Sequence, residues 1–565
     1  MNQYWWQDAA VYQIYPRSFM DSNGDGIGDI KGITLKLDYI RDLGVNVIWL
    51  SPVCCSPMMD NGYDVSDYDH IDPMFGTDGD FDELVREAES RGIKIVMDMV
   101  VNHCSSEHRW FLEALKEPEG KYGKYFFMRK GRAADGTEEL LPPNNWRSIF
   151  GGSAWERVPG TDYFYLHIFA KGQPDLNWEN PELREEIYAM VNRWIKRGVS
   201  GFRMDAITYL KKEPGLPSYP PDADDGLVSV KLGALNKPGL VDILKELRDR
   251  TYGRALLTVG EAEGVSGEEM DNFIGLTDGV FSMIFDFSFC QLNMKGPNYF
   301  WYEPREWTVE ELKSAVFNAD QSGGSGWLGT TLECHDQPRS IDHYLPPEGR
   351  NFKGASMLAM FSLFRRGTPF IYQGEEIGMR NIHLASVDEY DDVSTKNQYK
   401  RAIESGLSHE EAMGFIHEMS RDNARTPFQW NSLENAGFTA AGVKPWLPVN
   451  QNYTEINAEA EDKDPSSLLN WYRKLTGIRR SLEILRAGVS EPAYEETEGL
   501  AAYRRKLGAG TLLVLCNWQD RETEIDLSTE KITLIADNYG DVRREDGMLV
   551  LRPFEAACVE EVPEE

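Results

Sequence analysis

Short apolar runs alternate with amphipathic stretches along most of the chain. The runs are rich in β-branched and large apolar residues, and the stretches between them repeat apolar positions at helical spacing. Four helical candidates, at residues 35–44, 81–92, 182–198 and 240–253, each end in Gly, as a helix C-cap does. The pattern predicts eight strands, at residues 10–16, 45–52, 93–103, 198–207, 255–263, 280–287, 326–336 and 368–376. Eight such strands alternating with helices are typical of a parallel (β/α)8 TIM barrel, whose strands are covered on both faces.

Three parts of the chain fall outside this alternation. Residues 104–174 are too long for a loop and rich in Gly, Pro and aromatic side chains, so they predict an inserted B subdomain after strand three. Residues 377–455 form a second excursion, after strand eight. Residues 487–565 contain short strand-like runs separated by turns and predict a C-terminal all-β sandwich domain. The barrel then comprises residues 1–103 and 175–486.

Composition and charge narrow the class of partner. The 565 residues are 41% hydrophobic and 12% aromatic, enough to bury a large interior. The 59 basic and 92 acidic residues give a net charge of −33, which repels nucleic acids and anionic membranes. No stretch reaches the roughly 18 apolar residues of a membrane span, and no secretory signal is apparent. With seven scattered cysteines, we expect a cytoplasmic monomer or weak homo-oligomer with reduced thiols.

Polar side chains gather where the predicted strands end. In a barrel of this kind the catalytic groups come from the carboxyl ends of the strands. Two carboxyl groups about 5 to 5.5 Å apart are what a retaining glycoside hydrolase uses as nucleophile and acid/base. The side chains at these strand ends are Asp98, Asn102, His103, Arg203, Asp205, Glu261, His335 and Asp336. Three carboxylates among them are expected to meet at the same mouth of the barrel.

Long ordered motifs resemble a known enzyme family. The segments DMVVNH, GFRMDA, VGEAE and ECHDQPR resemble, in this order, the four signature regions of glycoside hydrolase family 13, the α-amylase family. QPDLNWENP is similar to its fifth region. WWQDAAVYQIYPRSF and SPMMDNGYDVSDY resemble its α-glucosidase and oligo-1,6-glucosidase branch. The resemblance spans nearly the whole chain and implies a barrel with a B insertion and a β-sandwich C domain.

The resemblance also implies catalytic roles. Asp205 would be the nucleophile, Glu261 the general acid/base and Asp336 the carboxylate that grips the distorted sugar. Arg203, two residues before Asp205 on the same strand face, is expected to keep that carboxylate ionised. No basic residue lies near Glu261 in sequence, which leaves room for a general acid to hold its proton. Asp98 is expected to support the site through hydrogen bonds.

Further residues are implied to bind sugar. Asp60 and Arg425 resemble the ion pair that closes the pocket floor, with Arg421 as a competitor of Arg425 for that role. A closed floor implies exo-action on short oligosaccharides or disaccharides. The remaining implied contacts are stacking by Tyr63 and hydrogen bonds from His103 and His335.

The segment DSNGDGIGD, residues 21–29, is a second candidate site, one for a metal ion. Its oxygen-bearing groups match positions 1, 3, 5, 7 and 9 of a calcium loop, with Gly26 at the sharp turn and Gly32 where a bidentate Glu is usual. The alternative is an Asx-rich turn that caps a helix. The α-glucosidase branch resembles this sequence in having a metal loop here, which favours a structural calcium ion, or magnesium, and no organic cofactor is expected. The candidate ligands are Asp21, Asn23, Asp25, the carbonyl of Ile27, and Asp29.

Two departures from the family pattern bear on specificity. Cys334 stands where Asn usually precedes the His-Asp pair, which reshapes subsites beyond the terminal glucose. Ala206 stands where α-1,6-specific members tend to carry Val, which favours α-1,4 links with mixed α-1,6 activity. We therefore expect a retaining exo-acting α-glucosidase. The alternatives are a sucrose isomerase or transglucosylase, although QPRSIDHY lacks the Arg-Leu-Asp-Arg pattern, and a non-catalytic scaffold, which would have lost its carboxylates.

Overall fold

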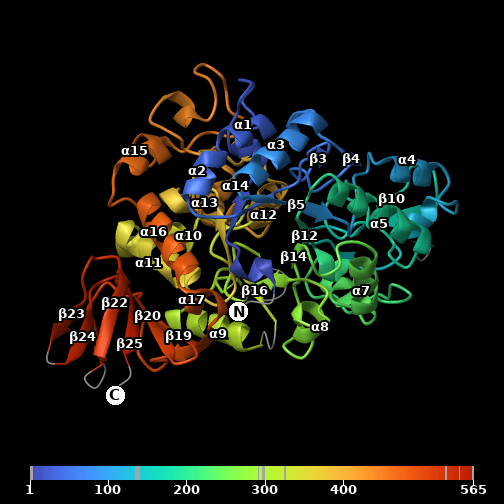
Figure 1. Cartoon of the computed structure of the whole chain (residues 1–565). Coiled ribbons are helices and arrows are strands. Elements are labelled where there is room, and N and C mark those ends of the chain that lie inside the picture. Colours follow the sequence, from blue (N-terminus) through green and yellow to red (C-terminus); the bar gives the residue numbers. More distant parts are fainter. Residues whose placement is uncertain are drawn as a thin grey trace.

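A closed barrel of parallel strands forms the centre of the molecule (Figure 1). The computed structural model describes residues 4–133, 140–290, 292–295, 300–322, 326–527, 531–545 and 547–562. The barrel order is β1-β17-β16-β15-β14-β12-β5-β2, so each strand pairs with its neighbour in sequence order and β1 closes on β17. All eight predicted strands and the predicted fold class are confirmed. The strands are β1 (Val11–Ile14), β2 (Val47–Leu50), β5 (Lys94–Val100), β12 (Gly201–Asp205), β14 (Leu257–Gly260), β15 (Met283–Phe285), β16 (Leu328–Thr331) and β17 (Thr368–Tyr372).

Helices surround the barrel and lie on its outer face. α5 shows why they form: Asn180 caps its first turn, Pro181 occupies the first helical position, and an apolar stripe including Ile187 and Trp194 is buried. The surrounding helices include α1 (Ile30–Leu35), α2 (Leu37–Asp42), α3 (Asp78–Ser90), α5 (Pro181–Lys196), α7 (Leu240–Arg250), α8 (Met270–Ile274), α9 (Val309–Ser322), α11 (Phe352–Leu363), α16 (Leu468–Ser481) and α17 (Glu483–Ala487).

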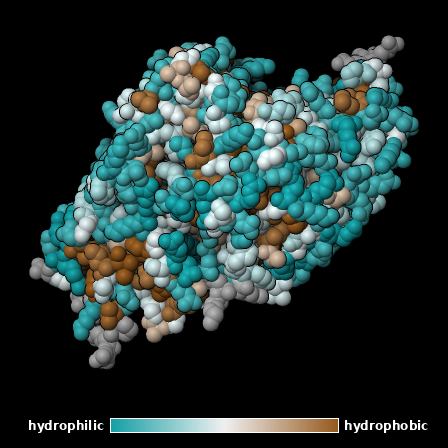
Figure 2. Space-filling view, turned by 45° about the horizontal axis from the view of Figure 1, so that its top comes forward, coloured by the Kyte–Doolittle hydropathy of each residue, from teal (hydrophilic) through white to brown (hydrophobic). Residues whose placement is uncertain are grey.

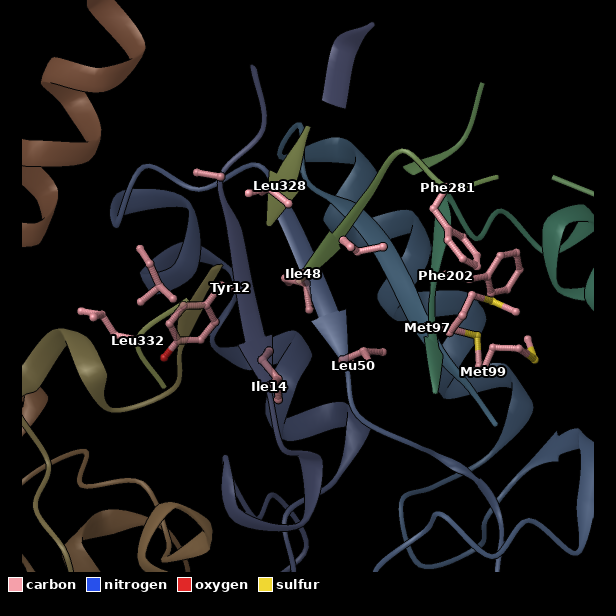
Figure 3. Packing of buried hydrophobic residues seen from close by; sticks show 14 of the residues in the cluster. Tyr12, Ile14, Ile48, Leu50, Met97, Met99, Phe202, Phe281, Leu328 and Leu332 are labelled. Carbon is pink, nitrogen blue, oxygen red and sulfur yellow. The ribbon is translucent and has the colours of Figure 1, made fainter. Parts of the chain in front are cut away.

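The strands bury both faces. Alternate residues point into the barrel, where Trp49 and Phe285 pack in a cluster with Val47, Val96 and Phe370. The intervening residues pack outward against the helices, and Figure 3 shows this layer with Tyr12, Ile14, Ile48, Leu50, Met97, Met99 and Phe202. Because apolar side chains fill both layers, the polar groups at the strand ends stand on a rigid support.

The chain between β5 and α5 forms the predicted insertion. It contains α4 (Arg109–Lys116) and a three-stranded antiparallel sheet of β6 (Met128–Lys130), β10 (Trp155–Arg157) and β11 (Tyr163–Leu166). A bridge between His103 and Asp175 and a buried ion pair of 2.6 Å between Lys212 and Asp175 hold its ends against the barrel mouth. Smaller strand pairs join β3 (Cys54–Cys55) with β4 (Asp67–Ile71), β7 (Arg132–Ala133) with β8 (Leu140–Leu141), and β9 (Trp146–Arg147) with β13 (Val228–Ser229).

Two antiparallel sheets form the C-terminal part, drawn in red in Figure 1. One has the order β18-β19-β20-β25-β22, and the other has β21-β24-β23. Buried side chains from both, such as Leu515, Ile525 and Leu549, share one core. Their strands are β18 (Val489–Ala493), β19 (Leu500–Leu507), β20 (Gly510–Asn517), β21 (Thr523–Asp526), β22 (Lys531–Asp537), β23 (Arg543–Glu545), β24 (Met548–Leu551) and β25 (Ala556–Val562).

The excursion after β17 contains α12 (Val393–Glu404), α13 (His409–Met419) and α14 (Asp422–Arg425), and α15 (Ala458–Lys463) follows it. None of the described helices combines the length and the apolar character that a membrane crossing needs. The face in Figure 2 is mostly hydrophilic, in keeping with the net charge of −33. All seven cysteines are free thiols, and six of them are buried.

Candidate active site

A cavity of about 700 Å³ opens at the carboxyl ends of the barrel strands. It lies where the sequence places the candidate catalytic groups, and all three predicted catalytic carboxylates line it. Arg425 and the predicted metal ligands are not among its lining residues. The polar part of the wall is formed by Asp60, Tyr63, His103, Arg203, Asp205, Glu261, His335, Asp336 and Arg421.

One buried arginine, Arg203, binds Asp205 and Glu261 of this wall and also Asp98, which does not line the cavity. Nη1 of Arg203 lies 2.9 Å from Asp98 Oδ1 and 2.6 Å from Asp205 Oδ1. Nη2 of the same guanidinium lies 2.9 Å from Glu261 Oε2. The register of the barrel creates the cluster, because Arg203 on β12 lies opposite Asp98 on β5 and Val259 on β14. Glu261, which has no basic neighbour in sequence, therefore has one in space.

The electrostatics of Asp205 differ from the prediction. Burial raises the pKa of the Asp205 carboxyl well above its ordinary value, and the charges of Glu261 and Asp98 add to this rise while Arg203 opposes it. Arg203 thus acts on Asp205 in the predicted direction, but burial outweighs it. The physical reason is that one guanidinium is shared among three carboxylates, of which Asp98 and Asp205 are buried and Glu261 is partly exposed.

The backbone after Asp205 positions Glu261. Ala206 adopts a left-handed conformation, with φ 44° and ψ 38°, which is strained for a residue with a Cβ atom. Its amide donates a 2.9 Å hydrogen bond to Glu261 Oε2. The two candidate catalytic carboxyl groups are thereby tied together through both Arg203 and this peptide group. The positive φ carries no sequence signal, because Ala rarely adopts it.

His335 and Tyr63 belong to one hydrogen-bonded chain. Gln13 Nε2 lies 2.8 Å from His335 Nδ1, and because an amide nitrogen only donates, Nδ1 accepts and Nε2 carries the hydrogen. His335 Nε2 lies 2.7 Å from the Tyr63 hydroxyl and 3.1 Å from Asp336 Oδ2. The Tyr63 hydroxyl donates to Asp98 Oδ2 at 2.9 Å. These hydrogen bonds fix the orientation of the His335 and Tyr63 rings, which stack with their centroids 5.2 Å apart.

His103 sits on the same wall and is almost fully buried. Burial lowers the pKa of its imidazole to about 4, so the ring is neutral at physiological pH. Its Nε2 lies 3.0 Å from the Tyr63 carbonyl oxygen. Gln173, which motif reasoning did not single out, donates to Asp60 Oδ2 at 3.0 Å and to the Tyr63 carbonyl at 3.1 Å. Its only sequence signal is its place at the start of QPDLNWENP.

The pocket floor is closed by Arg421 rather than Arg425. Nη2 of Arg421 lies 3.2 Å from Asp60 Oδ1, and its Nη1 lies 3.0 Å from Asp336 Oδ1. Arg425 makes no ion pair with Asp60; its Nη2 contacts Asp336 at 2.8 Å. Arg421 is the N-cap residue of α14 and lines the cavity, whereas Arg425 ends this helix and is fully buried. The predicted pairing of Asp60 with Arg425 is therefore wrong, and the competing arginine takes that place.

The two carboxyl groups of the floor, Asp60 and Asp336, have pKa values shifted in opposite directions. Burial raises the pKa of the Asp60 carboxyl to about 6, although Arg421 and Arg425 both oppose the rise. Burial also acts on Asp336, but His335, Arg421 and Arg425 outweigh it and hold the pKa of this carboxyl well below its usual range. These contacts thus favour the ionised form of Asp336.

The predicted metal loop is folded by its own side chains. The Asp21 carboxylate accepts hydrogen bonds from three loop amides and from the Thr439 hydroxyl, and Asp29 caps α1. Asn23 and Asp25 are exposed and each accepts one loop amide. Within the described residues, no group of three or more His, Cys, Asp or Glu side chains is placed to hold a metal ion. The predicted ligands Asp21, Asp25 and Asp29 are therefore not gathered into a metal-binding cluster, and each accepts hydrogen bonds from backbone amides instead.

The whole chain matches known proteins. Residues 13–488 match the alpha-amylase catalytic-domain family. The chain belongs to the alpha-amylase family. An oligo-1,6-glucosidase of Parageobacillus thermoglucosidasius is 43% identical over 564 residues, covering 98% of this chain and 99% of its relative. The predictions of this family and of a glycoside hydrolase are confirmed.

Solved structures of the alpha-amylase family extend the comparison. The isomaltulose synthase PalI of Klebsiella sp. LX3 is 35% identical and superposes with a TM-score of 0.92, with both chains fully covered. A trehalose-6-phosphate hydrolase of Bacillus licheniformis is 36% identical, with a TM-score of 0.91 over 99% of this chain and 100% of the other. The barrel and its accessory domains are thus shared with enzymes whose names describe different reactions.

Proposed function

We propose that this enzyme is a retaining, exo-acting α-glucosidase that removes terminal α-linked glucose from short neutral oligosaccharides. The observation that carries the proposal is the single Arg203 guanidinium that holds Asp205 and Glu261 side by side. Carboxyl groups bound to one guanidinium lie close together, which favours the spacing of about 5 to 5.5 Å of retaining enzymes over the about 6.5 to 9.5 Å of inverting ones.

The geometry supports a double displacement. Asp205 attacks the anomeric carbon while Glu261 gives its proton to the departing glycosidic oxygen, which leaves glucose bound covalently to Asp205. Glu261 then takes a proton from water, whose oxygen displaces Asp205 and releases glucose with its original configuration. For this step Asp205 must be ionised and Glu261 protonated.

Asp336 and the floor hold the terminal glucose. The carboxylate of Asp336 stays negative beside His335, Arg421 and Arg425, so it accepts hydrogen bonds from sugar hydroxyls and stabilises positive charge developing on the ring. Asp60 and Arg421 close the pocket beneath it. A closed floor admits one glucose unit beyond the cleaved bond, which is the basis for proposing exo-action.

Linkage specificity is proposed from the residue after Asp205 and from the relatives. The small side chain of Ala206, which lines the cavity, leaves room that supports α-1,4 links, while the name of the oligo-1,6-glucosidase relative favours α-1,6 links. We therefore propose activity on both. Purified protein incubated with maltose, isomaltose, sucrose and p-nitrophenyl α-glucoside is expected to release glucose from at least the first two. Folded protein that releases glucose from none of the four would contradict the proposal.

Sucrose isomerisation is the second candidate, because an isomaltulose synthase shares the fold so closely. The segment after Asp336, QPRSIDHY, argues against it, since it lacks the Arg-Leu-Asp-Arg pattern of the isomerases. Product analysis with sucrose separates the two. Glucose and fructose support hydrolysis, and a sucrose isomer as main product supports isomerisation.

A phosphorylated disaccharide fits this cavity poorly. Six carboxylates line it, those of Asp60, Asp205, Glu261, Glu263, Asp286 and Asp336, against three cationic side chains, those of Arg203, Lys231 and Arg421. Each of these three cations already forms an ion pair with a carboxylate. A phosphate would thus meet net negative charge, so a neutral saccharide is the favoured substrate.

Matched arginine variants test the pocket floor. We expect Arg421→Lys to raise KM for isomaltose by about tenfold or more, because a lysine cannot contact Asp60 and Asp336 together. Arg425→Lys should affect KM less and lower Tm more, because a lysine cannot replace the contacts of this fully buried guanidinium with Asp336 and the His335 carbonyl. Steady-state kinetics and thermal melts of both variants provide the measurement. A larger rise in KM for Arg425→Lys than for Arg421→Lys would instead assign the closing of the pocket floor to Arg425.

Calcium is proposed to bind the loop at residues 21–29 and to stabilise the fold rather than take part in catalysis. Binding at a hundredfold excess over the dissociation constant stabilises the folded state by about 2.7 kcal/mol. We therefore expect calcium to raise the Tm of EDTA-treated protein, and Asp25→Ala, which changes an exposed side chain, to abolish the gain. A Tm that calcium does not change would contradict the proposal that calcium binds this loop.

A further inference from the structure

Two segments that are far apart in the sequence form the pocket floor. Asp60 lies in the loop after β2, and Arg421 is the N-cap residue of α14. Their ion pair closes the floor, so the pocket depends on how the Arg421 side chain is held. An arginine side chain is long and has many rotamers, and its planar guanidinium reaches two carboxylates together only in a suitable orientation.

Asp392, the N-cap residue of α12, binds this guanidinium. Its Oδ1 accepts hydrogen bonds from Arg421 Nε at 3.0 Å and from Arg421 Nη2 at 2.5 Å. Nη1 of the same group then contacts Asp336, and Nη2 also reaches Asp60. Asp392 is fully buried and is not among the lining residues of the cavity. It therefore acts on the floor through Arg421 rather than by touching a sugar.

The contact between Asp392 and Arg421 joins two full charges. Burial acts to raise the pKa of the Asp392 carboxyl, but Arg421 and Arg425 outweigh it and lower this pKa to about 2. Hydrogen bonds between two ionised groups are stronger than those between neutral ones, and a buried pair is screened little by salt. Asp392 can thus fix the Arg421 side chain against the loss of its rotamer freedom.

The two oxygens of Asp392 have different partners. Oδ2 accepts hydrogen bonds from the amide and the hydroxyl of Thr395, at 2.9 and 2.7 Å, and thereby caps α12. Oδ1 accepts the Ser394 amide at 3.1 Å in addition to the arginine. Asn and Ser are also good N-cap residues, but neither carries a negative charge. The helix cap therefore does not require an aspartate, whereas the contact with Arg421 does.

The backbone at Asp392 is attached to both halves of the floor. The Asp422 carboxylate, next to Arg421 in α14, accepts the amides of Asp391 and Asp392 at 2.7 and 3.0 Å. Asp391 Oδ2 lies 3.4 Å from an arginine, Arg17, whose Nη1 donates to the side chain of the residue after Asp60. This segment thus sets the position of Arg421 relative to the loop that carries its partner.

We propose that Asp392 is a positioning residue that aims the Arg421 guanidinium at the pocket floor and so determines how well the terminal glucose binds. The proposal rests on the α-glucosidase function proposed above. It goes beyond that function in assigning part of the sugar affinity to a side chain outside the cavity, one that acts only through Arg421.

A double-mutant cycle on KM tests this role. We expect Asp392→Asn and Asp392→Ser, which keep an N-cap side chain, to raise KM for isomaltose by about fivefold or more, as for groups coupled in one ion-pair network. The change in kcat should be smaller, because the floor binds the ground state and the transition state alike. In an Arg421→Met background, Asp392→Asn should change KM by less than about twofold, since no guanidinium is left to position.

A second buried acid–arginine pair provides the control. Glu555, in the C-terminal part, is fully buried and lies 2.7 Å from Arg552. Glu555→Gln also removes a buried carboxylate from an arginine, so we expect it to lower Tm, as Asp392→Asn does, while KM for isomaltose stays unchanged. A rise in KM confined to the Asp392 variants is a result that a merely structural role would not give.

The outcomes separate this proposal from the one on which it rests. If folded wild-type protein releases no glucose from isomaltose, maltose or p-nitrophenyl α-glucoside, the proposed function fails and the role of Asp392 fails with it. If the wild type is active but folded Asp392→Asn and Asp392→Ser keep its KM, the positioning proposal alone is overturned. Increases in KM that multiply when Asp392→Asn is combined with Arg421→Met also overturn it.

Discussion

Asp205→Ala is expected to abolish hydrolysis of isomaltose, with kcat lower by a factor of about 10⁴ or more, and to be rescued by azide. Without the carboxylate no covalent intermediate forms, and the substitution leaves a space beneath the anomeric carbon. Azide entering that space displaces an activated leaving group in a single inversion. With p-nitrophenyl α-glucoside the expected product is therefore β-glucosyl azide, which NMR distinguishes from its anomer.

Protein stability provides the control for this variant. Asp205 is buried and its pKa is raised by that burial, so replacing it removes a desolvated acid and should not lower Tm strongly. Asp205→Asn offers a variant of nearly the same shape. Activity retained by folded Asp205→Asn, or formation of α-glucosyl azide by Asp205→Ala, would assign the nucleophile to another residue.

Glu261→Ala is expected to lose activity in a way that depends on the leaving group. Isomaltose needs a proton on its departing oxygen, so its kcat/KM should fall by about 10² to 10⁴, the range of general acid catalysis. p-Nitrophenolate departs without that proton, so kcat/KM for the nitrophenyl substrate should fall much less. The covalent intermediate then accumulates, because no base activates water for its release.

Azide again identifies the role. In Glu261→Ala it attacks the covalent intermediate, and two successive inversions give α-glucosyl azide, the opposite anomer to that from Asp205→Ala. The pair of variants is thus internally matched, since each controls for non-specific effects of azide on the other. An equal loss of activity on both substrates, or a β-azide product, would exclude Glu261 as the acid/base.

The strands and their terminal polar residues could be predicted from the sequence because both are local properties. Each strand is a largely apolar run; Asp98 and Arg203 lie within such runs, Asp205 ends one and Glu261 directly follows one. What the sequence could not show is set by register and packing. The contact between Arg203 and Glu261, for example, depends on the pairing of β12 with β14.

The pocket floor shows the same limit at a finer scale. Arg421 and Arg425 are one helical turn apart in RDNAR, so sequence spacing places them on one side of the helix without deciding which reaches Asp60. The structure distinguishes them, because the first faces the cavity and the second is fully buried. Gln13 and Gln173 were missed because their roles come entirely from partners distant in the chain.

The central claim is that glucose leaves with the configuration it had in the substrate. Proton NMR of p-nitrophenyl α-glucoside hydrolysis, recorded before mutarotation becomes significant, measures this directly, because all the glucose released comes from the cleaved bond. The account predicts that α-glucose appears first and that the β-anomer grows only as the solution equilibrates. Initial release of β-glucose would contradict a double displacement at Asp205 and Glu261.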